Sequence, residues 1–184
     1  MLALSAAAFL HYACLHNIAM PAITKSAIAE AITVIEKVDT RQRELLADDI
    51  HSHQPQLLAS VLAQQQFGAS LEQIDVLLNV LLVSYLAMKN SGHVWPVVSE
   101  EMQERCFARF AGRIRFLEAL TNDQKDTAIS VAVTDHSEKW LLAFVFDELQ
   151  THELLVIDTD AKKFLVLCAV GMVECVAEAA SHSA

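Results

Sequence analysis

The densest group of potential metal ligands in the sequence consists of Asp48, Asp49, His51 and His53, of which Asp48, His51 and His53 are our candidates. Asp48 and His51 are three residues apart, so a helix would place both side chains on one face. A carboxylate close to two imidazoles is a donor set that transition metals accept. We predict these three residues as candidate metal ligands, and a solvated helix end is the simpler interpretation. The Glu-x-x-His motif of di-iron bundles does not occur in the sequence.

A basic stripe is formed by Arg105, Arg109 and Arg113, which recur every four residues. On a helix this spacing aligns the three guanidinium groups along one face. Guanidinium groups pair strongly with carboxylates and phosphates, so the stripe is a candidate site for an anionic ligand or an acidic partner helix. The alternative is pairing with acidic helices of the same chain. Glu101, four residues before Arg105, already offers one ordinary pair of that kind.

His93 and Trp95 lie on a connector, residues 93–98, which the Trp95-Pro96 step keeps from being helical. A tryptophan beside a proline either seals the edge of a core or lines the rim of a pocket, because connecting segments often carry binding residues. We keep His93 and Trp95 as candidate ligand-binding residues together with the arginine stripe.

We predict no catalytic residue. Asp135 precedes His136, as a carboxylate that orients a base would, but we interpret Asp135 as a helix cap that forms a capping box with Glu138. Glu148 and His152 are four residues apart, a spacing that suits a ligand pair but is common by chance. The sequence contains no Gly-x-Ser-x-Gly, no phosphate-binding glycine-rich loop and no His-Glu-x-x-His. A non-enzymatic role is therefore favoured, and the sequence indicates no particular cofactor.

The composition is that of an acidic and unusually apolar chain. Of its 184 residues, 54% are hydrophobic and 20% are charged, and the formal net charge is -10. Such a surface repels the phosphate backbone of nucleic acids, so we expect no nucleic-acid partner. The apolar surplus predicts that a second copy covers part of the surface in a homodimer, and it also suits a different protein partner.

The four cysteines are Cys14, Cys106, Cys168 and Cys175. They form no Cys-x-x-Cys pair, so neither a zinc ribbon nor a thioredoxin-like motif is indicated. We interpret them as reduced thiols in the core of a cytoplasmic protein.

The elements that must position these residues are helices. Glycine and proline are scarce, and good helix formers fill the long segments. The stretch Val76–Met88 contains two strongly polar residues, Asn79 and Ser84, and a helix that is apolar on all sides is a buried helix. We predict an all-α, single-domain bundle of seven to eight helices around it. The apolar runs are shorter than the roughly 20 residues that cross a membrane, so we expect no membrane span.

Periodicity and cap residues predict where the helices lie. Pro55 suits a first helical turn, Gly68 a helix end, Ser70 a capping box with residue 73 and Ser99 an N-cap. Thr127–Val133 is ambiguous between strand and helix, and we interpret it as a short helix after a polar loop. The expected helices are 25–50 (one bent helix or two in series), 55–67, 71–90, 100–120, 127–133, 136–152 and 159–180.

The helical domain, residues 25–184, divides into a first half, 25–92, and a second half, 93–184, which resemble each other. Residues 57–61 and 141–145 share the pattern Leu-Leu-Ala-x-Val at an offset of 84. An offset of 88 then aligns the apolar segments 76–78 and 164–166. We hypothesise two related three-helix halves whose third helices meet at the centre. The alternative is chance similarity between leucine-rich helices.

Three classes of function fit these observations. The first is a non-enzymatic interaction or regulatory protein, such as an adaptor or an immunity-type partner, because local catalytic motifs are missing and the chain is rich in apolar residues. The second is a helical bundle that holds a small ligand or a metal between its helices. The third, which we favour least, is an enzyme without local motifs.

Residues 1–24 contain no Asp, Glu, Lys or Arg, and all such residues fall from Lys25 onward. A secretory signal would carry a basic stretch at its start. This segment is an extra helix, a poor signal or anchor, or an over-long start with Met20 as the true initiator, and we favour the last. N-terminal sequencing of the native protein is then expected to start at position 20, and an intact mass that counts from Met1 would contradict this.

Overall fold

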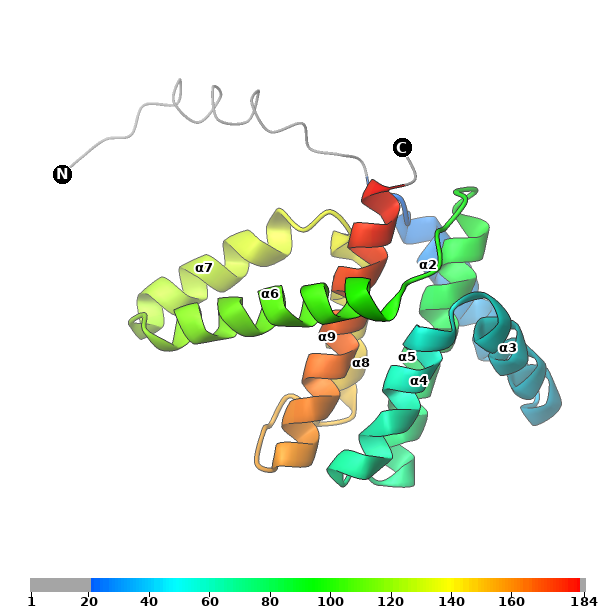
Figure 1. The fold of residues 1–184 in the computed structure, drawn as a ribbon, viewed down its shortest axis with the longest axis horizontal. Coiled ribbons are helices and arrows are strands. Elements are labelled where there is room, and N and C mark those ends of the chain that lie inside the picture. Colours follow the sequence, from blue (N-terminus) through cyan, green and yellow to red (C-terminus); the bar gives the residue numbers. More distant parts are fainter. Residues whose placement is uncertain (1–20, 183–184) are drawn as a thin grey trace, which may run out of the picture.

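The computed structural model describes residues 21–182, and every regular element in that range is a helix (Figure 1). The expectation about Met20 lies outside the described residues. The elements are α2 Lys25–Ile35, α3 Thr40–His53, α4 Pro55–Leu62, the 3₁₀ helix η1 Ala63–Phe67, α5 Leu71–Asn90, α6 Glu100–Glu118, α7 Asn122–Thr134, α8 Lys139–Thr151 and α9 Asp160–Ser181. The eight α-helices described in this range confirm the predicted all-α bundle and its predicted number of helices.

Ser70, Ser99 and Gly68 set helix boundaries as predicted. The Ser70 hydroxyl accepts the Gln73 N–H at 3.2 Å, and the Gln73 side chain accepts the Ser70 N–H at 2.9 Å, so a capping box opens α5. The Ser99 hydroxyl caps the first turn of α6 in the same way, at 3.1 Å. Gly68 ends η1 with φ of 87°, a conformation in which a side chain would be strained. A further capping box at Asp39 opens α3, so region 25–50 is two helices in series.

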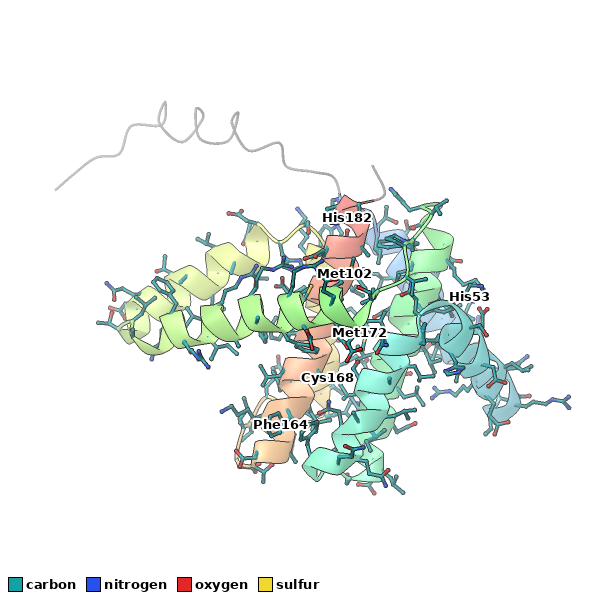
Figure 2. The ribbon with its side chains drawn as sticks, viewed as in Figure 1. His53, Met102, Phe164, Cys168, Met172 and His182 are labelled. Atoms are coloured by element: carbon teal, nitrogen blue, oxygen red, sulfur yellow. The ribbon has the colours of Figure 1, made fainter. Side chains whose placement is uncertain are left out.

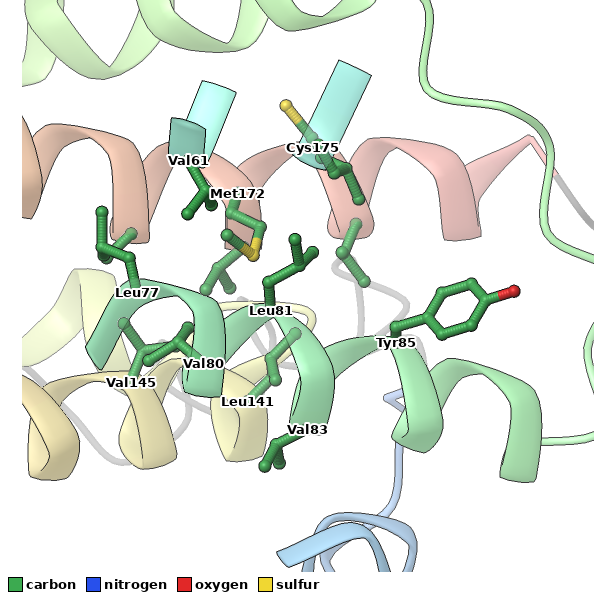
Figure 3. Packing of buried hydrophobic residues seen from close by; sticks show 14 of the residues in the cluster. Val61, Leu77, Val80, Leu81, Val83, Tyr85, Leu141, Val145, Met172 and Cys175 are labelled. Atoms are coloured by element: carbon green, nitrogen blue, oxygen red, sulfur yellow. The ribbon is translucent and has the colours of Figure 1, made fainter. Parts of the chain in front are cut away.

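The helix α5 lies at the centre of the bundle and is buried over most of its length, as predicted for Val76–Met88. Leu77 and Leu81 have no exposed surface, and burying one leucine side chain stabilises a fold by roughly 1.5–3 kcal/mol. The helix packs against α2, α4, α8 and α9. Figure 3 shows Leu77 and Leu81 on the side of α5 that faces Met172 of α9. The two predicted third helices therefore pack together, while the relation between the two halves stays a prediction.

Among the described residues, α5 and α9 are the helices that are long and apolar enough to cross a membrane. Within their most apolar windows, 50% of α5 and 61% of α9 is buried inside the protein. Core helices of soluble proteins show the same length and composition, so these two helices are weak indicators of membrane insertion. The expected absence of a span remains a prediction.

The helices α6 and α7 form a hairpin that projects from the body of the bundle (Figure 1). The start of α6 lies against α9 and buries Met102 and Cys106. At the crossing, a Cβ atom on Gly171 of α9 would overlap the ring of Phe107. The missing side chain at Gly171 therefore allows α6 to approach α9 closely.

The expected polar loop before residue 127 is instead the first part of α7. The helix begins at Asn122, and the Gln124 side chain accepts the Thr121 N–H at 3.1 Å. Asp123 and Gln124 are exposed, and polar residues cost little on a solvent-facing helix. The helical interpretation of Thr127–Val133 is confirmed, with an earlier start.

The predicted capping box of Asp135 with Glu138 is wrong. Asp135 ends α7, and the Glu138 carboxylate accepts the N–H groups of Ala22 and Ile23 at 2.9 and 3.1 Å. Glu138 is 1% exposed. The N–H groups of the chain just before α2 are close to this buried carboxylate, and a buried polar group must be hydrogen-bonded, so the long-range bonds replace the local cap.

Replacing Gly171 with alanine is expected to destabilise the protein by about 1–3 kcal/mol, the usual cost of overpacking, because the new Cβ would overlap the Phe107 ring. The matched control is Gly112→Ala in α6, where a Cβ would meet no atom within 4 Å. This control should stabilise the protein by up to about 1 kcal/mol, since alanine favours the helix. Urea unfolding followed by circular dichroism measures both changes, and an equal effect of the two would contradict the close crossing of α6 and α9.

Candidate functional site

Two glutamates, Glu174 and Glu178, lie four residues apart on α9, which is otherwise apolar over most of its length. Their side chains are 7% and 9% exposed. A carboxylate this deeply buried needs a charged or hydrogen-bonding partner, because burial of an unpaired charge is costly. The residues around Glu174 and Glu178 must therefore carry positive charge or donate hydrogen bonds.

The arginine stripe of α6 supplies the partners. Arg113 pairs with Glu174, Arg109 pairs with Glu178, and Arg105 also pairs with Glu178 at 2.9 Å. The three arginine side chains remain about half exposed. Arg105 keeps its predicted pair with Glu101 at 3.1 Å. The arginine stripe is therefore paired with acids of the same chain. Arginines four residues apart on α6 lie opposite glutamates four residues apart on α9.

His136, on the link between α7 and α8, is the other partner of Glu174. Its Nδ1 atom accepts the Glu138 N–H at 3.0 Å, so the ring proton is placed on Nε2. Nε2 lies 3.5 Å from the Glu174 carboxylate, and the His136 side chain is 9% exposed. The backbone bond therefore fixes the tautomer and aims the ring N–H at the carboxylate.

Both glutamates are stabilised in their ionised form. Burial acts to raise the pKa of Glu174, but the hydrogen bond from His136 and the charge of Arg113 outweigh it and lower the pKa below its ordinary value. The hydrogen bond from Arg105 lowers the pKa of Glu178, and Arg109 adds to this against a smaller effect of burial. At neutral pH the site therefore holds two carboxylates and three guanidinium groups, all charged.

Two thiols lie under this network. The Cys106 sulfur is 3.3 Å from an Arg109 nitrogen and 3.6 Å from a Glu178 oxygen. Burial is the main cause that raises the pKa of Cys106 and also that of Cys175 on α9. Both thiols are protonated at neutral pH, and a protonated thiol is a poor nucleophile.

A cavity of about 730 Å³ opens over these groups, between α6, the end of α7 and the C-terminal part of α9. Figure 2 shows His182 at the C-terminal end of α9, where it contributes to one end of the cavity. The ion pairs of Arg109 with Glu178 and of Arg113 with Glu174 form part of its lining, so both signs of charge border the cavity. The lining residues are Arg109, Arg113, Ala132, Asp135, His136, Ser137, Glu174, Ala177, Glu178, Ser181 and His182.

The predicted metal ligands lie elsewhere, on α3. Asp48 and His51 are exposed, and His53 pairs with Asp49 at 3.1 Å. Within residues 21–182, no three His, Cys, Asp or Glu side chains converge as a metal site requires. The spacing of Asp48 and His51 gives a shared face, but no further ligand from another helix completes it.

The predicted connector residues are also separate from the cavity. Trp95 donates its ring N–H to the Met88 carbonyl at 2.8 Å and to the Ser91 hydroxyl at 3.0 Å. It therefore covers the C-terminal end of α5, where carbonyl groups lack helical partners. His93 is exposed beside it. The arrangement matches the core-edge interpretation of Trp95.

The sequence-based reasoning did not identify Glu174, Glu178 or His136 as site residues. A signal was present for the glutamates, because two acids four residues apart in an apolar helix match the repeat of the arginine stripe. The signal for His136 was its place beside Asp135, but we interpreted that pair as a helix cap.

Comparison with known proteins places no relative beside this chain. No sequence profile of a protein family, no curated protein and no solved structure matches it. The chemistry of the cavity is therefore the basis for a functional proposal.

Acid is expected to weaken the fold through these glutamates. Their pKa values are lowered in the folded state, so their contribution is complete above the unfolded value of about 4.3 and is lost as the pH falls through the folded values. Urea unfolding measured from neutral pH down to about pH 3 should show that the free energy of unfolding falls less in the double variant Glu174→Gln, Glu178→Gln than in the original protein.

The control for this measurement is Glu101→Gln, because the Glu101 side chain is 83% exposed and pairs with Arg105 at the surface. This variant should keep the pH dependence of the original protein. A double variant with the same pH dependence as the original protein would contradict the role assigned to Glu174 and Glu178.

Proposed function

We propose that this chain is a non-enzymatic regulatory protein that binds a small zwitterionic molecule in the cavity between α6 and α9. The observation that supports this proposal is that two ion pairs, Arg109 with Glu178 and Arg113 with Glu174, line a cavity of about 730 Å³. Cavities of roughly 300–1,000 Å³ suit small-molecule ligands.

The charge balance of the cavity favours a ligand that carries both signs. An anion alone would draw Arg109 or Arg113 away from its glutamate, so that Glu178 would keep only Arg105 and Glu174 only His136, which weakens the neutralisation of a buried carboxylate. A cation alone would compete with the arginines for Glu174 and Glu178. A zwitterion places its carboxylate on the arginines and its ammonium group on the glutamates, so every charge keeps a partner.

The arginines and the glutamates differ in exposure, and this difference supports exchange of partners. The glutamates are buried on a core helix, whereas the Arg109 and Arg113 side chains are 48% and 52% exposed. The long arginine side chains can rotate toward an incoming carboxylate without moving the backbone of α9.

Ligand binding offers a physical basis for regulation. The pairs of Arg109 and Arg113 link the projecting α6–α7 hairpin to α9 (Figure 1). A ligand that takes over these pairs changes the free energy that holds the hairpin in place, and so shifts its population between positions.

Binding is favoured over catalysis by the ionisation of the site. Ionised glutamates are not proton donors, and the buried thiol of Cys106 is protonated. The ionised carboxylates and guanidinium groups that line the cavity suit recognition of charge, and each already has a partner of opposite charge.

Isothermal titration calorimetry with a panel of free α-amino acids, and with acetate and ethylamine as singly charged analogues, tests the proposal. We expect binding of at least one amino acid and none of either analogue. Arg109→Gln should weaken that binding about tenfold or more, the effect of losing one charge-assisted hydrogen bond. Glu178 keeps Arg105 in this variant, so the fold should persist.

The matched control is Arg115→Gln, an exposed arginine of the same helix that does not line the cavity. It should bind the amino acid as the original protein does. Absence of binding by the whole panel, equal binding of acetate, or equal losses in the two variants would contradict the proposal.

A further inference from the structure

The end of the bundle opposite the cavity exposes a group of large apolar side chains. They come from two places that meet there, the segment from α4 to the start of α5 and the segment from the α8–α9 loop to the start of α9 (Figure 1). Leu71 is 75% exposed and Val156 is 65% exposed. We call this group the apolar end, and its residues are Leu62, Phe67, Leu71, Val156, Ile157 and Phe164.

A direct contact joins the two segments. The rings of Phe67 and Phe164 lie with their centroids 4.8 Å apart, within the range of a favourable aromatic pair. Figure 2 shows Phe164 near the start of α9, where η1 also packs. Two distant parts of the chain therefore meet within the apolar end.

The α8–α9 loop is held in position by a backbone hydrogen bond and a buried leucine side chain. Glu153 adopts φ of 56°, and the Leu154 N–H donates to the Leu149 carbonyl at 2.8 Å, which is the helix-ending motif with a left-handed residue. Leu154 is 3% exposed and anchors the loop in the core. Val156 and Ile157 follow this anchored part of the loop and are exposed to solvent.

The charges around the apolar end are mainly acidic. Lys162 is paired with Asp158 at 3.2 Å, and Lys163 is the other base of this region. The exposed acids of the same two segments are Glu72, Asp75, Glu153, Asp158 and Asp160. An exposed apolar patch with a polar rim is typical of an interaction site, and here the rim selects for positive charge.

We propose that the apolar end is a docking surface for a basic amphipathic helix of another protein. An apolar stripe on that helix would cover Phe67, Leu71 and Val156, and its flanking lysines and arginines would meet the acidic rim. A second copy using the same face would bring acid against acid, because a two-fold interface pairs identical patches. An anionic membrane surface would also be repelled, because its charge has the same sign as that of the acidic rim.

This surface is independent of the proposed ligand cavity. Phe164 and Glu178 are fourteen positions apart on α9, which corresponds to about 21 Å along a helix, and no residue of the apolar end is among those that line the cavity.

The test uses the full chain and a fluorescein-labelled helical peptide of about 18 residues, with a leucine stripe and lysines at the other positions. Its matched counterpart carries glutamate in place of lysine. Fluorescence anisotropy should show binding of the lysine peptide, and affinity for the glutamate peptide weaker by about tenfold or more.

Variants locate the binding on the apolar end. Leu71→Ser with Val156→Ser should weaken the lysine peptide about tenfold or more, and Glu72→Gln with Asp75→Asn should weaken it less and mainly at low salt. Val94→Ser is the control, because Val94 is 88% exposed on the connector before α6. All these positions are exposed, so thermal unfolding should show unchanged stability.

Several outcomes would overturn the proposal. Absence of peptide binding would do so, as would equal binding by the Leu71→Ser, Val156→Ser variant, which would place the peptide elsewhere on the acidic surface. A dimer in sedimentation velocity that this variant converts to a monomer would identify a second copy as the occupant. If the original protein sediments with phosphatidylserine vesicles and this variant does not, the occupant is a membrane instead.

Discussion

The pairing of Glu174 and Glu178 with the arginines of α6 constrains the second half of the molecule. A helix as buried as α9 can carry two carboxylates only if cations reach them, because the cost of an unpaired buried charge exceeds what a surface pair contributes. The matching four-residue repeats supply those cations along the whole crossing. Gly171 allows the close approach that the pairing needs. The position of the α6–α7 hairpin follows from these two requirements together.

The same requirement produces a site as well as a fold. Arginine side chains that come from a projecting hairpin stay half exposed, and the carboxylates that they neutralise stay fixed. A charged cavity lined by these ion pairs is therefore a by-product of burying the two acids. His136 strengthens the arrangement, because its backbone hydrogen bond commits the ring to Glu174.

The two ends of α9 present contrasting chemistry. Its C-terminal part carries the charged cavity, and its start carries Phe164 in an apolar surface with an acidic rim. Between them the helix packs on α5 in the core (Figure 3). One helix thus carries the charged cavity near its C-terminal end and part of the apolar end near its start.

Local features of the sequence determined the helices themselves. The capping box at Ser70 and the apolar run Val76–Met88 define α5, and Ser99 opens α6, because caps and periodicity act within one turn or one face of a helix. Tertiary structure decided which faces meet. The repeat of Arg105, Arg109 and Arg113 shows that they share a face, but a helical repeat carries no information about the helix that it will oppose. The position of Glu138 in the sequence likewise suited a local capping box. Its carboxylate instead accepts the N–H groups of Ala22 and Ile23, because satisfying buried donors outweighs the gain from one exposed cap.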